Sequence, residues 1–214
     1  MIQHDIAGIE IPDSILANQV TEFIRDTESS LLFRHSVRVY CWAALTGNRM
    51  GLSFDLELLY AAAMFHDLGL TSRYKESQLR FEVDGANAAR DFLRTHGISE
   101  SDLEIVWNAV ALHTTPGIPE FMRPEIALLQ AGAGMDVAGR RYDEFTDAQR
   151  EAVIAAFPRG AGFKQGMIEA FYQGMKHRPN STFGTFNDDF LAARDKTFQR
   201  VDMCSVIHHS KWPD

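Results

Sequence analysis

The chain has 214 residues, which is enough for one domain of ordinary size and too few for two comfortable ones. Its composition, with 45% hydrophobic and 23% charged residues, excludes a disordered chain, a collagen-like repeat and a disulfide scaffold. The 29 acidic residues outnumber the 21 basic ones and leave a net charge of −8. We therefore expect no binding to nucleic acid or to an anionic membrane, since phosphate groups repel such a surface.

Signals for membrane insertion or export are absent from the sequence. No apolar run reaches the roughly 18 residues that a membrane-spanning helix needs, and the opening segment MIQHDIAGIEIPDS lacks the basic and apolar parts of a signal peptide. Cys41 and Cys204 lie far apart, each among apolar neighbours, which predicts two buried free thiols in a reducing compartment. We expect a cytoplasmic protein that acts on a small molecule, with homo-oligomerisation left open.

Helical periodicity runs through almost the whole chain, and the alternation typical of strands is almost absent. Asp13 after Pro12 is a predicted N-cap, and Gly47 follows a helical stretch where a C-terminal glycine belongs. The sequence predicts one all-α domain over residues 1–214, with a core at about 29–140 and C-terminal helices at 146–210 that pack on it. The expected helices, in chain order, are 13–26, 29–47, 55–67, 83–96, 100–113, 124–137, 146–157, 163–175 and 187–208.

Three connecting segments are candidates for function. Segments 68–82 and 114–124 each follow a helix with an ionisable end, and functional residues often lie on such loops. Segment 176–189 is polar and expected to be irregular. It is interpreted either as a lid or as a surface crossing before the last helix.

Side chains that can bind a metal lie on the apolar stripes of four expected helices. His35, His66, His113 and Asp136 each occupy a core-facing stripe position, and Asp67 directly follows His66. A buried imidazole or carboxylate without a partner costs several kcal/mol. One such residue commonly finds its own partner, but five together favour convergence on one cation. This nitrogen and oxygen set suits Zn, Mn, Fe or Co better than Ca or Mg.

The adjacent pair His66 and Asp67 needs a local departure from helical geometry to serve one site. Neighbouring residues on a helix point about 100° apart. Gly69 follows closely, and glycine at that position favours helix termination. A relaxed last turn would let both side chains reach the same metal.

The order His35, His66–Asp67 and Asp136 forms an H…HD…D pattern, which resembles the HD-domain superfamily of metal-dependent hydrolases. The resemblance implies a helical bundle with a buried metal site in which these four residues are the ligands. It extends from about Ile11 to the end of the chain. The flanking motifs are similar to the cyanamide hydratase-like branch: FRHSVRVY (33–40), MFHDLGL (64–70), RFEVDGANAA (80–89), GAGMDVAG (132–139) and HHSKWPD (208–214).

The number of metals follows from the histidines between the HD pair and the last aspartate. HD proteins with two metals have two further histidines in this interval, and this chain offers His96 and His113. His96 precedes Gly97 at a helix end, where it is expected to bond the last carbonyls or complement the helix dipole. Residues 80–88 contain no histidine, so one metal is favoured and His113 is left free for proton transfer.

The resemblance implies an enzyme that uses metal-bound hydroxide on a small substrate, with cyanamide or a related nitrile-like molecule as the first choice. Zinc is the expected metal, with Fe, Mn or Co as alternatives. His113, Asp67 and Glu82 are the candidate groups for proton transfer, although Glu82 at a helix start is also explained by the helix dipole. Substrate-binding residues are not predicted.

Other functions remain open at this level. One is a phosphohydrolase that acts on a nucleotide or another phosphoester, although the sequence contains no glycine-rich phosphate loop. Another is a non-catalytic regulatory module that binds a metal. A di-iron oxygenase is disfavoured by the missing histidine. The paired His208 and His209 are expected to be adventitious, and Arg34 and Arg38 to be solvated or salt-bridged.

Overall fold

Helix α2 (Ser30–Met50) runs through the middle of the fold and is buried along most of its length. The structure is a computed structural model that describes residues 5–212. Helix α6 (Pro124–Ala138) packs closely on α2. This approach depends on Gly132, because a Cβ at that position would collide with the carbonyl oxygen of Val39. The same two helices position several of the candidate site residues.

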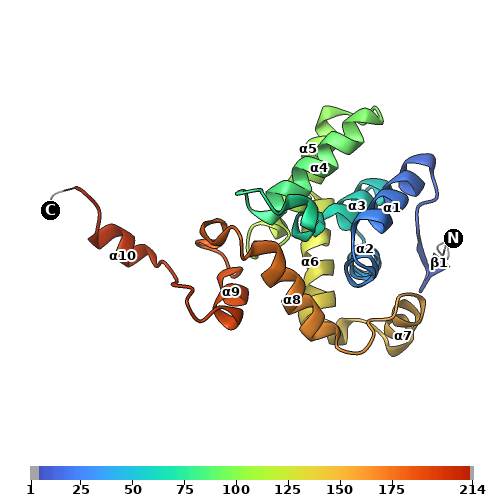
Figure 1. The fold of residues 1–214 in the computed structure, drawn as a ribbon. Helices are drawn as coiled ribbons and strands as arrows, with labels where there is room; N and C mark the ends of the chain where they lie inside the picture. The colour runs from blue at the N-terminus through green and yellow to red at the C-terminus, as the bar shows by residue number, and fades with distance from the viewer. Residues whose placement is uncertain (1–4, 213–214) are drawn as a thin grey trace.

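The described residues are almost entirely helical, which confirms the prediction of an all-α fold (Figure 1). A two-residue hairpin of β1 (Asp5–Ile6) and β2 (Ile9–Glu10), which the sequence did not predict, precedes the helices. The remaining α-helices are α1 (Ile15–Thr27), α3 (Leu56–Phe65), α4 (Phe81–Thr95), α5 (Glu100–Leu112), α7 (Asp147–Ala156), α8 (Phe163–Met175), α9 (Asp188–Arg194) and α10 (Met203–His208). Short 3-10 turns are η1 (Leu68–Leu70), η2 (Ser72–Tyr74), η3 (Pro119–Phe121), η4 (Tyr142–Glu144) and η5 (Pro179–Thr182).

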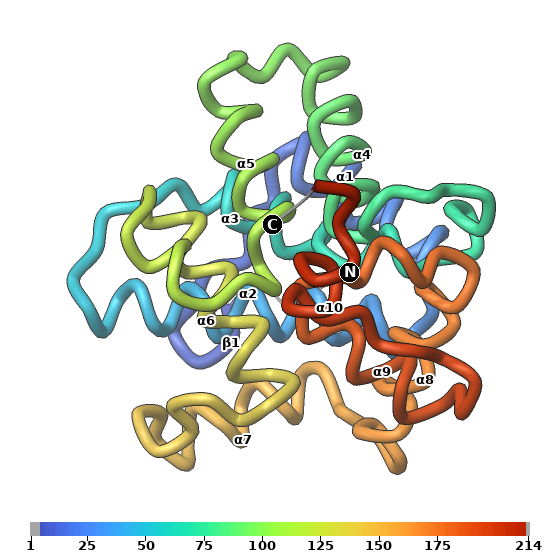
Figure 2. Tube along the Cα trace, turned by 90° about the vertical axis from the view of Figure 1, so that its left-hand side faces the viewer, coloured from blue at the N-terminus to red at the C-terminus, as the bar shows by residue number. Residues whose placement is uncertain are grey.

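The core has two parts. The larger apolar cluster contains buried residues from each of the helices α1 through α6. In Figures 1 and 2 the α4–α5 hairpin lies at the opposite end of the molecule from α7. A smaller cluster attaches α8 and α9 to α2, η1 and the start of α4. Its buried members are Leu32, Leu70, Phe81, Phe163, Met167, Phe171, Met175 and Leu191. The C-terminal helices α8 and α9 therefore cover one side of the central helices.

The prediction of one continuous helix at 187–208 is wrong. Helix α9 ends at Arg194, and the Asp195 carboxylate then accepts hydrogen bonds from the backbone N–H and the hydroxyl of Thr197, at 2.8 and 2.6 Å. Such a local turn competes with helix continuation. Helix α10 begins only after Asp202 and projects away from the rest of the molecule (Figure 1).

The predicted burial of the two cysteines holds for only one of them. Cys41 is buried in the core, but Cys204 lies on α10 and is exposed, so its prediction is wrong. The last two residues of the motif 208–214 and the first four of the opening segment lie outside the described residues. Among residues 5–212, no helix is both long enough and apolar enough to cross a membrane.

Segment 176–189 is fixed by buried polar contacts. The Arg178 guanidinium donates hydrogen bonds to the carbonyls of Gly174 and Leu79, at 2.9 and 2.8 Å, to the carbonyl of Gly69 and to the Asp84 carboxylate. Arg178 is fully buried, and these partners come from α8, η1 and the start of α4. The segment is therefore held against the central helices.

Candidate metal centre

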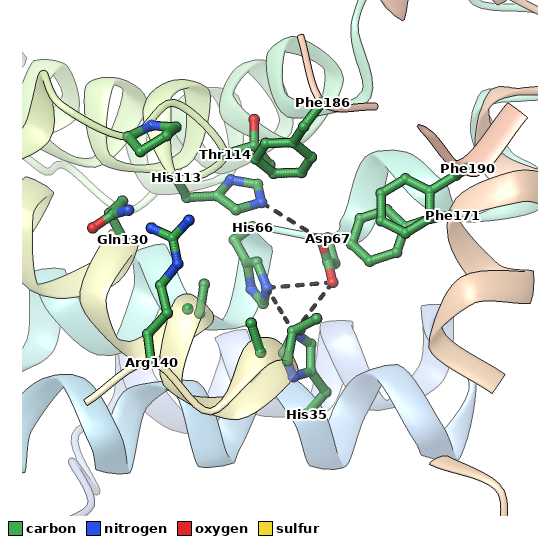
Figure 3. Close-up of a pocket in the computed structure, with 15 residues that line it drawn as sticks. His35, His66, Asp67, His113, Thr114, Gln130, Arg140, Phe171, Phe186 and Phe190 are labelled. Carbon is green, nitrogen blue, oxygen red and sulfur yellow. Dashed lines mark hydrogen bonds and ion pairs between the residues drawn. The ribbon is translucent and has the colours of Figure 1, made fainter. Parts of the chain in front are cut away.

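Three predicted ligands meet in the interior of the fold (Figure 3). The Nε2 atoms of His35 and His66 lie 3.2 Å apart, and the Asp67 carboxylate oxygen Oδ2 lies 3.4 and 3.3 Å from them. All three residues are at most 1% exposed. Ligand atoms this close, on three buried residues, form a group that can hold a metal ion.

The relaxed turn expected after His66 is present and allows the adjacent pair to share one site. Helix α3 ends at Phe65, and Asp67 has φ −104° and ψ 4°, outside helical geometry. Gly69 then packs on the backbone of Phe81, where any Cβ would collide with the Phe81 carbonyl. This close approach fixes the turn against the start of α4.

The second ring nitrogen of each histidine is already bonded, which determines where the lone pairs point. His66 and His113 each place Nδ1 2.7 Å from the carbonyl oxygen three residues earlier. A carbonyl only accepts, so Nδ1 carries the proton and Nε2 carries the lone pair. In His35, Nδ1 lies 2.7 Å from Asp136 Oδ2 and donates to that carboxylate. Nε2 is therefore a free acceptor in His66 and His113, and the same holds for the neutral form of His35, as in metal-binding histidines.

The Asp67 carboxylate shows that the cluster fits a cation. Both of its oxygens are buried, and neither accepts a hydrogen bond from the described residues. His113 adds a third imidazole, with Nε2 3.7 Å from Asp67 Oδ1. Acceptors that converge without a donor repel one another, and buried polar groups left unpaired are costly. A divalent metal would satisfy all of them at once.

The protonation states of Asp67 and His66 match a metal site, whereas in His35 burial is outweighed by Asp136 and Asp67, which raise the pKa of His35. Burial favours the neutral form of Asp67, but the neighbouring His66, His113 and His35 outweigh it and hold the Asp67 pKa well below its usual range. Burial lowers the pKa of His66, with help from His113 and His35. An ionised carboxylate and a neutral imidazole are the forms that bind a metal.

Asp136 lies on the opposite side of the His35 ring, and the structure does not bring it into the cluster. Its carboxylate accepts hydrogen bonds from Arg38 Nε and Nη2, both at 2.8 Å, and from Trp42 Nε1 at 2.9 Å. Burial raises the Asp136 pKa, but His35 and Arg38 outweigh it and hold the pKa well below its usual range. Asp136 therefore orients the imidazole of His35, and Arg38 is a buried ion-pair partner rather than a solvated residue.

Glu82 is close to the site but is not part of the cavity wall. Its carboxylate accepts hydrogen bonds from the Thr114 hydroxyl, from Arg80 Nη2 at 2.8 Å and from Asn187 Nδ2 at 2.9 Å. Burial raises the Glu82 pKa, but Arg80 and His113 outweigh it, and the net shift is downward. These contacts join the start of α4 to the residue before α9. They account for Glu82 as an anchor through Oε1, while Oε2 accepts only from Arg80 Nε, at 3.4 Å.

A cavity of about 330 Å³ opens beside the cluster. His113 lies in its wall, as expected for a group that contacts substrate, whereas His96 is exposed and bonds the Phe92 carbonyl at 2.8 Å. His208 is exposed on α10. The wall comprises His35, His66, Asp67, His113, Thr114, Pro116, Gln130, Ala133, Gly134, Val137, Ala138, Arg140, Phe171, Phe186 and Phe190.

The sequence analysis does not identify several residues that line the cavity. Gln130 stands among apolar residues of α6, and a polar side chain on the inward stripe was an available signal. Arg140 follows Gly139, which ends α6, and only the folded chain shows that it turns back to the cavity. Phe171, Phe186 and Phe190 carry no signal in the sequence that distinguishes them from phenylalanines of the core.

A comparison with known protein families finds a match to the HD domain over residues 32–152, more than half of the chain. HD domains are typically metal-dependent hydrolases. The matched part contains His35, His66 and Asp67, which lie close enough together to hold a metal. A search of curated proteins finds no match to the chain. The family match and the buried cluster together show that this chain belongs to the HD-domain family.

Proposed function

We propose that this protein is a hydrolase or hydratase in which His35, His66 and Asp67 hold one divalent transition metal. The observation that carries the proposal is the convergence of unpaired Nε2 atoms on a buried carboxylate that accepts no hydrogen bond. When bound, such a metal lowers the pKa of a coordinated water toward about 7 and polarises the electrophile. Zinc is the first choice on ligand chemistry, and Fe, Mn and Co suit the same donors.

The protein groups around the cluster have separable tasks. Asp136 and the carbonyls that bond Nδ1 hold the rings in one orientation. His113 is a candidate to accept and return a proton, because its Nε2 faces Asp67 from the cavity wall. Phe171, Phe186 and Phe190 also line the cavity, and their apolar rings exclude water from a bound substrate.

The proposed substrate is a small molecule with a nitrile-like or amide-like group, with cyanamide as the reference compound. The largely apolar wall and the resemblance of the flanking motifs to cyanamide hydratase-like proteins support this choice. A phosphoester is the second candidate, and Arg140 in the cavity wall is the observation that favours it.

Metal analysis followed by a substrate screen tests the proposal. We expect about one equivalent of a transition metal per chain by elemental analysis. The loaded protein should then hydrate cyanamide or another small nitrile. Turnover of nucleoside monophosphates or cyclic nucleotides with cyanamide and other nitriles untouched would instead establish the phosphohydrolase. Two irons per chain would contradict the single-metal site.

His113→Ala is expected to lower kcat by about 10²- to 10⁴-fold, the usual contribution of general acid–base catalysis. Metal content should stay the same, because the substitution removes a proton carrier and leaves the three proposed ligands in place. Steady-state kinetics and elemental analysis on the same preparation check both points. Loss of metal in His113→Ala would show that His113 is itself a ligand.

A further inference from the structure

The cavity beside the cluster has two chemically different ends. Phe171 and Phe190 lie on the Asp67 side, whereas Gln130 and Arg140 lie on the other side of the His66 ring (Figure 3). A substrate whose reacting group reaches the cluster therefore has an apolar surface on one side and a polar one on the other.

The end of α6 holds Arg140 in this position. Gly139 adopts a left-handed conformation with φ 67°, which glycine tolerates without strain. The chain then turns back, and the Arg140 N–H donates to the carbonyl of Gly134 at 3.2 Å. The Arg140 stem lies against Gly134, where a Cβ would stand 3.0 Å from Cδ. The guanidinium thus extends beside the cavity from a fixed backbone.

The polar groups at this end have no partners of their own. Gln130 is only 8% exposed, yet its amide forms no hydrogen bond with any residue from 5 to 212. Within the same described range, the Arg140 guanidinium forms no ion pair or hydrogen bond either. The amide atoms of Gln130 keep some solvent contact, so they are open to a ligand in the cavity. Both groups are donors aimed at the space in which a ligand would lie.

The cavity has room for a nitrile-like or amide-like substrate larger than cyanamide, which serves as the smallest reference compound. Its volume of about 330 Å³ lies within the range of roughly 300–1,000 Å³ that is typical of small-molecule sites. A molecule of three heavy atoms at the cluster would leave the phenylalanines and the Arg140 end without contacts.

We infer that the substrate is an amphipathic monoanion whose carboxylate lies at Arg140 and Gln130, while its reacting group lies at the metal cluster. A guanidinium matches the two oxygens of a carboxylate, and the Gln130 amide can donate a further hydrogen bond. An apolar part of the molecule packs against Phe171, Phe186 and Phe190. This inference rests on the proposed function, for which it names the substrate class.

A series of metal-binding probes tests the inference without relying on turnover. Alkyl hydroxamates that end in a carboxylate, with two to six methylene groups between, are compared with matched primary amides. Titration calorimetry on the metal-loaded protein gives each dissociation constant. We expect the best carboxylate to bind at least about 10-fold more tightly than its amide, as for charge-assisted hydrogen bonds to Arg.

Arg140→Gln should abolish the preference for carboxylate and leave the affinity for the neutral amide unchanged. Arg141→Gln is the matched control, because Arg141 is adjacent, pairs with Glu144 at 4.0 Å and is absent from the cavity wall. A preference that persists in Arg140→Gln, or that is absent at every length in the unaltered protein, would overturn the inference.

Two further outcomes separate this inference from the function on which it rests. A phosphonate series that binds more tightly than the carboxylates at the same lengths would overturn the carboxylate assignment and favour a phosphoester. If no hydroxamate binds the metal-loaded protein, the proposed metal site fails and the inference fails with it.

Discussion

Asp67→Asn should leave the protein folded but unable to retain a divalent metal. The Asp67 carboxylate is the one charged ligand of the proposed set, and its oxygens have no hydrogen-bond donor to lose. Loss of an outer partner of a metal ligand costs roughly 10- to 100-fold in affinity, and loss of the ligand itself should cost more. The metal-to-protein ratio after dialysis should fall from about one to near zero.

Stability of the metal-free protein distinguishes a ligand from a structural residue. The amide has nearly the same shape as the carboxylate, so metal-free Asp67→Asn should stay folded and lose only the attraction to the neighbouring imidazoles that lowers the Asp67 pKa. Added metal should stabilise the parent by about 2.7 kcal/mol at 100 times the dissociation constant, with no effect on the variant. The exposed His208→Ala should behave like the parent. A variant that binds metal normally would place the site elsewhere.

Asp136→Asn should produce a large loss of stability. It leaves the Arg38 guanidinium charged and completely buried beside a neutral amide. Breaking a buried ion pair by removing one partner costs about 3–5 kcal/mol, a large share of the roughly 5–15 kcal/mol that stabilises a typical protein. Urea unfolding of the metal-free protein measures the effect without a contribution from the metal. An unfolding free energy within error of the parent would contradict this role.

Two controls belong to the Asp136 experiment. Arg38→Met in the Asp136→Asn background removes the buried Arg38 charge, although Arg159, 3.4 Å from Asp136 in the parent, remains. It should recover part of the loss, because the effects of contacting residues are not additive. Glu100→Gln, at the exposed pair with Arg94, should have little effect. The Asp136 pKa is depressed in the folded state, so its contribution is complete above the unfolded-state value of about 3.9 and is lost as the pH falls. The parent should therefore lose more stability in acid than Asp136→Asn.

The sequence predicted the fold class and the convergence of the histidines because helical periodicity determines which side chains face inward. His35, His66 and His113 lie on such stripes and all reach the cavity. Periodicity predicts whether a side chain is buried and which face of its helix it occupies. It does not predict which atom of a neighbouring ring that side chain contacts. This is why the side of His35 on which Asp136 lies, and its pairing with Arg38, could not be predicted.

The remaining differences come from local turns and from contacts distant in sequence. The predicted last helix is interrupted where Asp195 bonds Thr197, a competition that hydrophobic pattern does not reveal. Glu82 could be placed at a helix start, but its partner Asn187 is more than a hundred residues away. The polar end of the cavity depends on the same kind of tertiary contact, because Arg140 reaches it only through the turn after α6.

The four hydrogen bonds of Arg178 determine how molecules can enter and leave the cavity. The guanidinium and the Asn187–Glu82 contact fix both ends of the segment that carries Phe186. Swinging this segment outward would leave a buried charge unpaired, at a cost of several kcal/mol. We therefore expect this backbone segment to stay in place while the side chains of the cavity wall rotate.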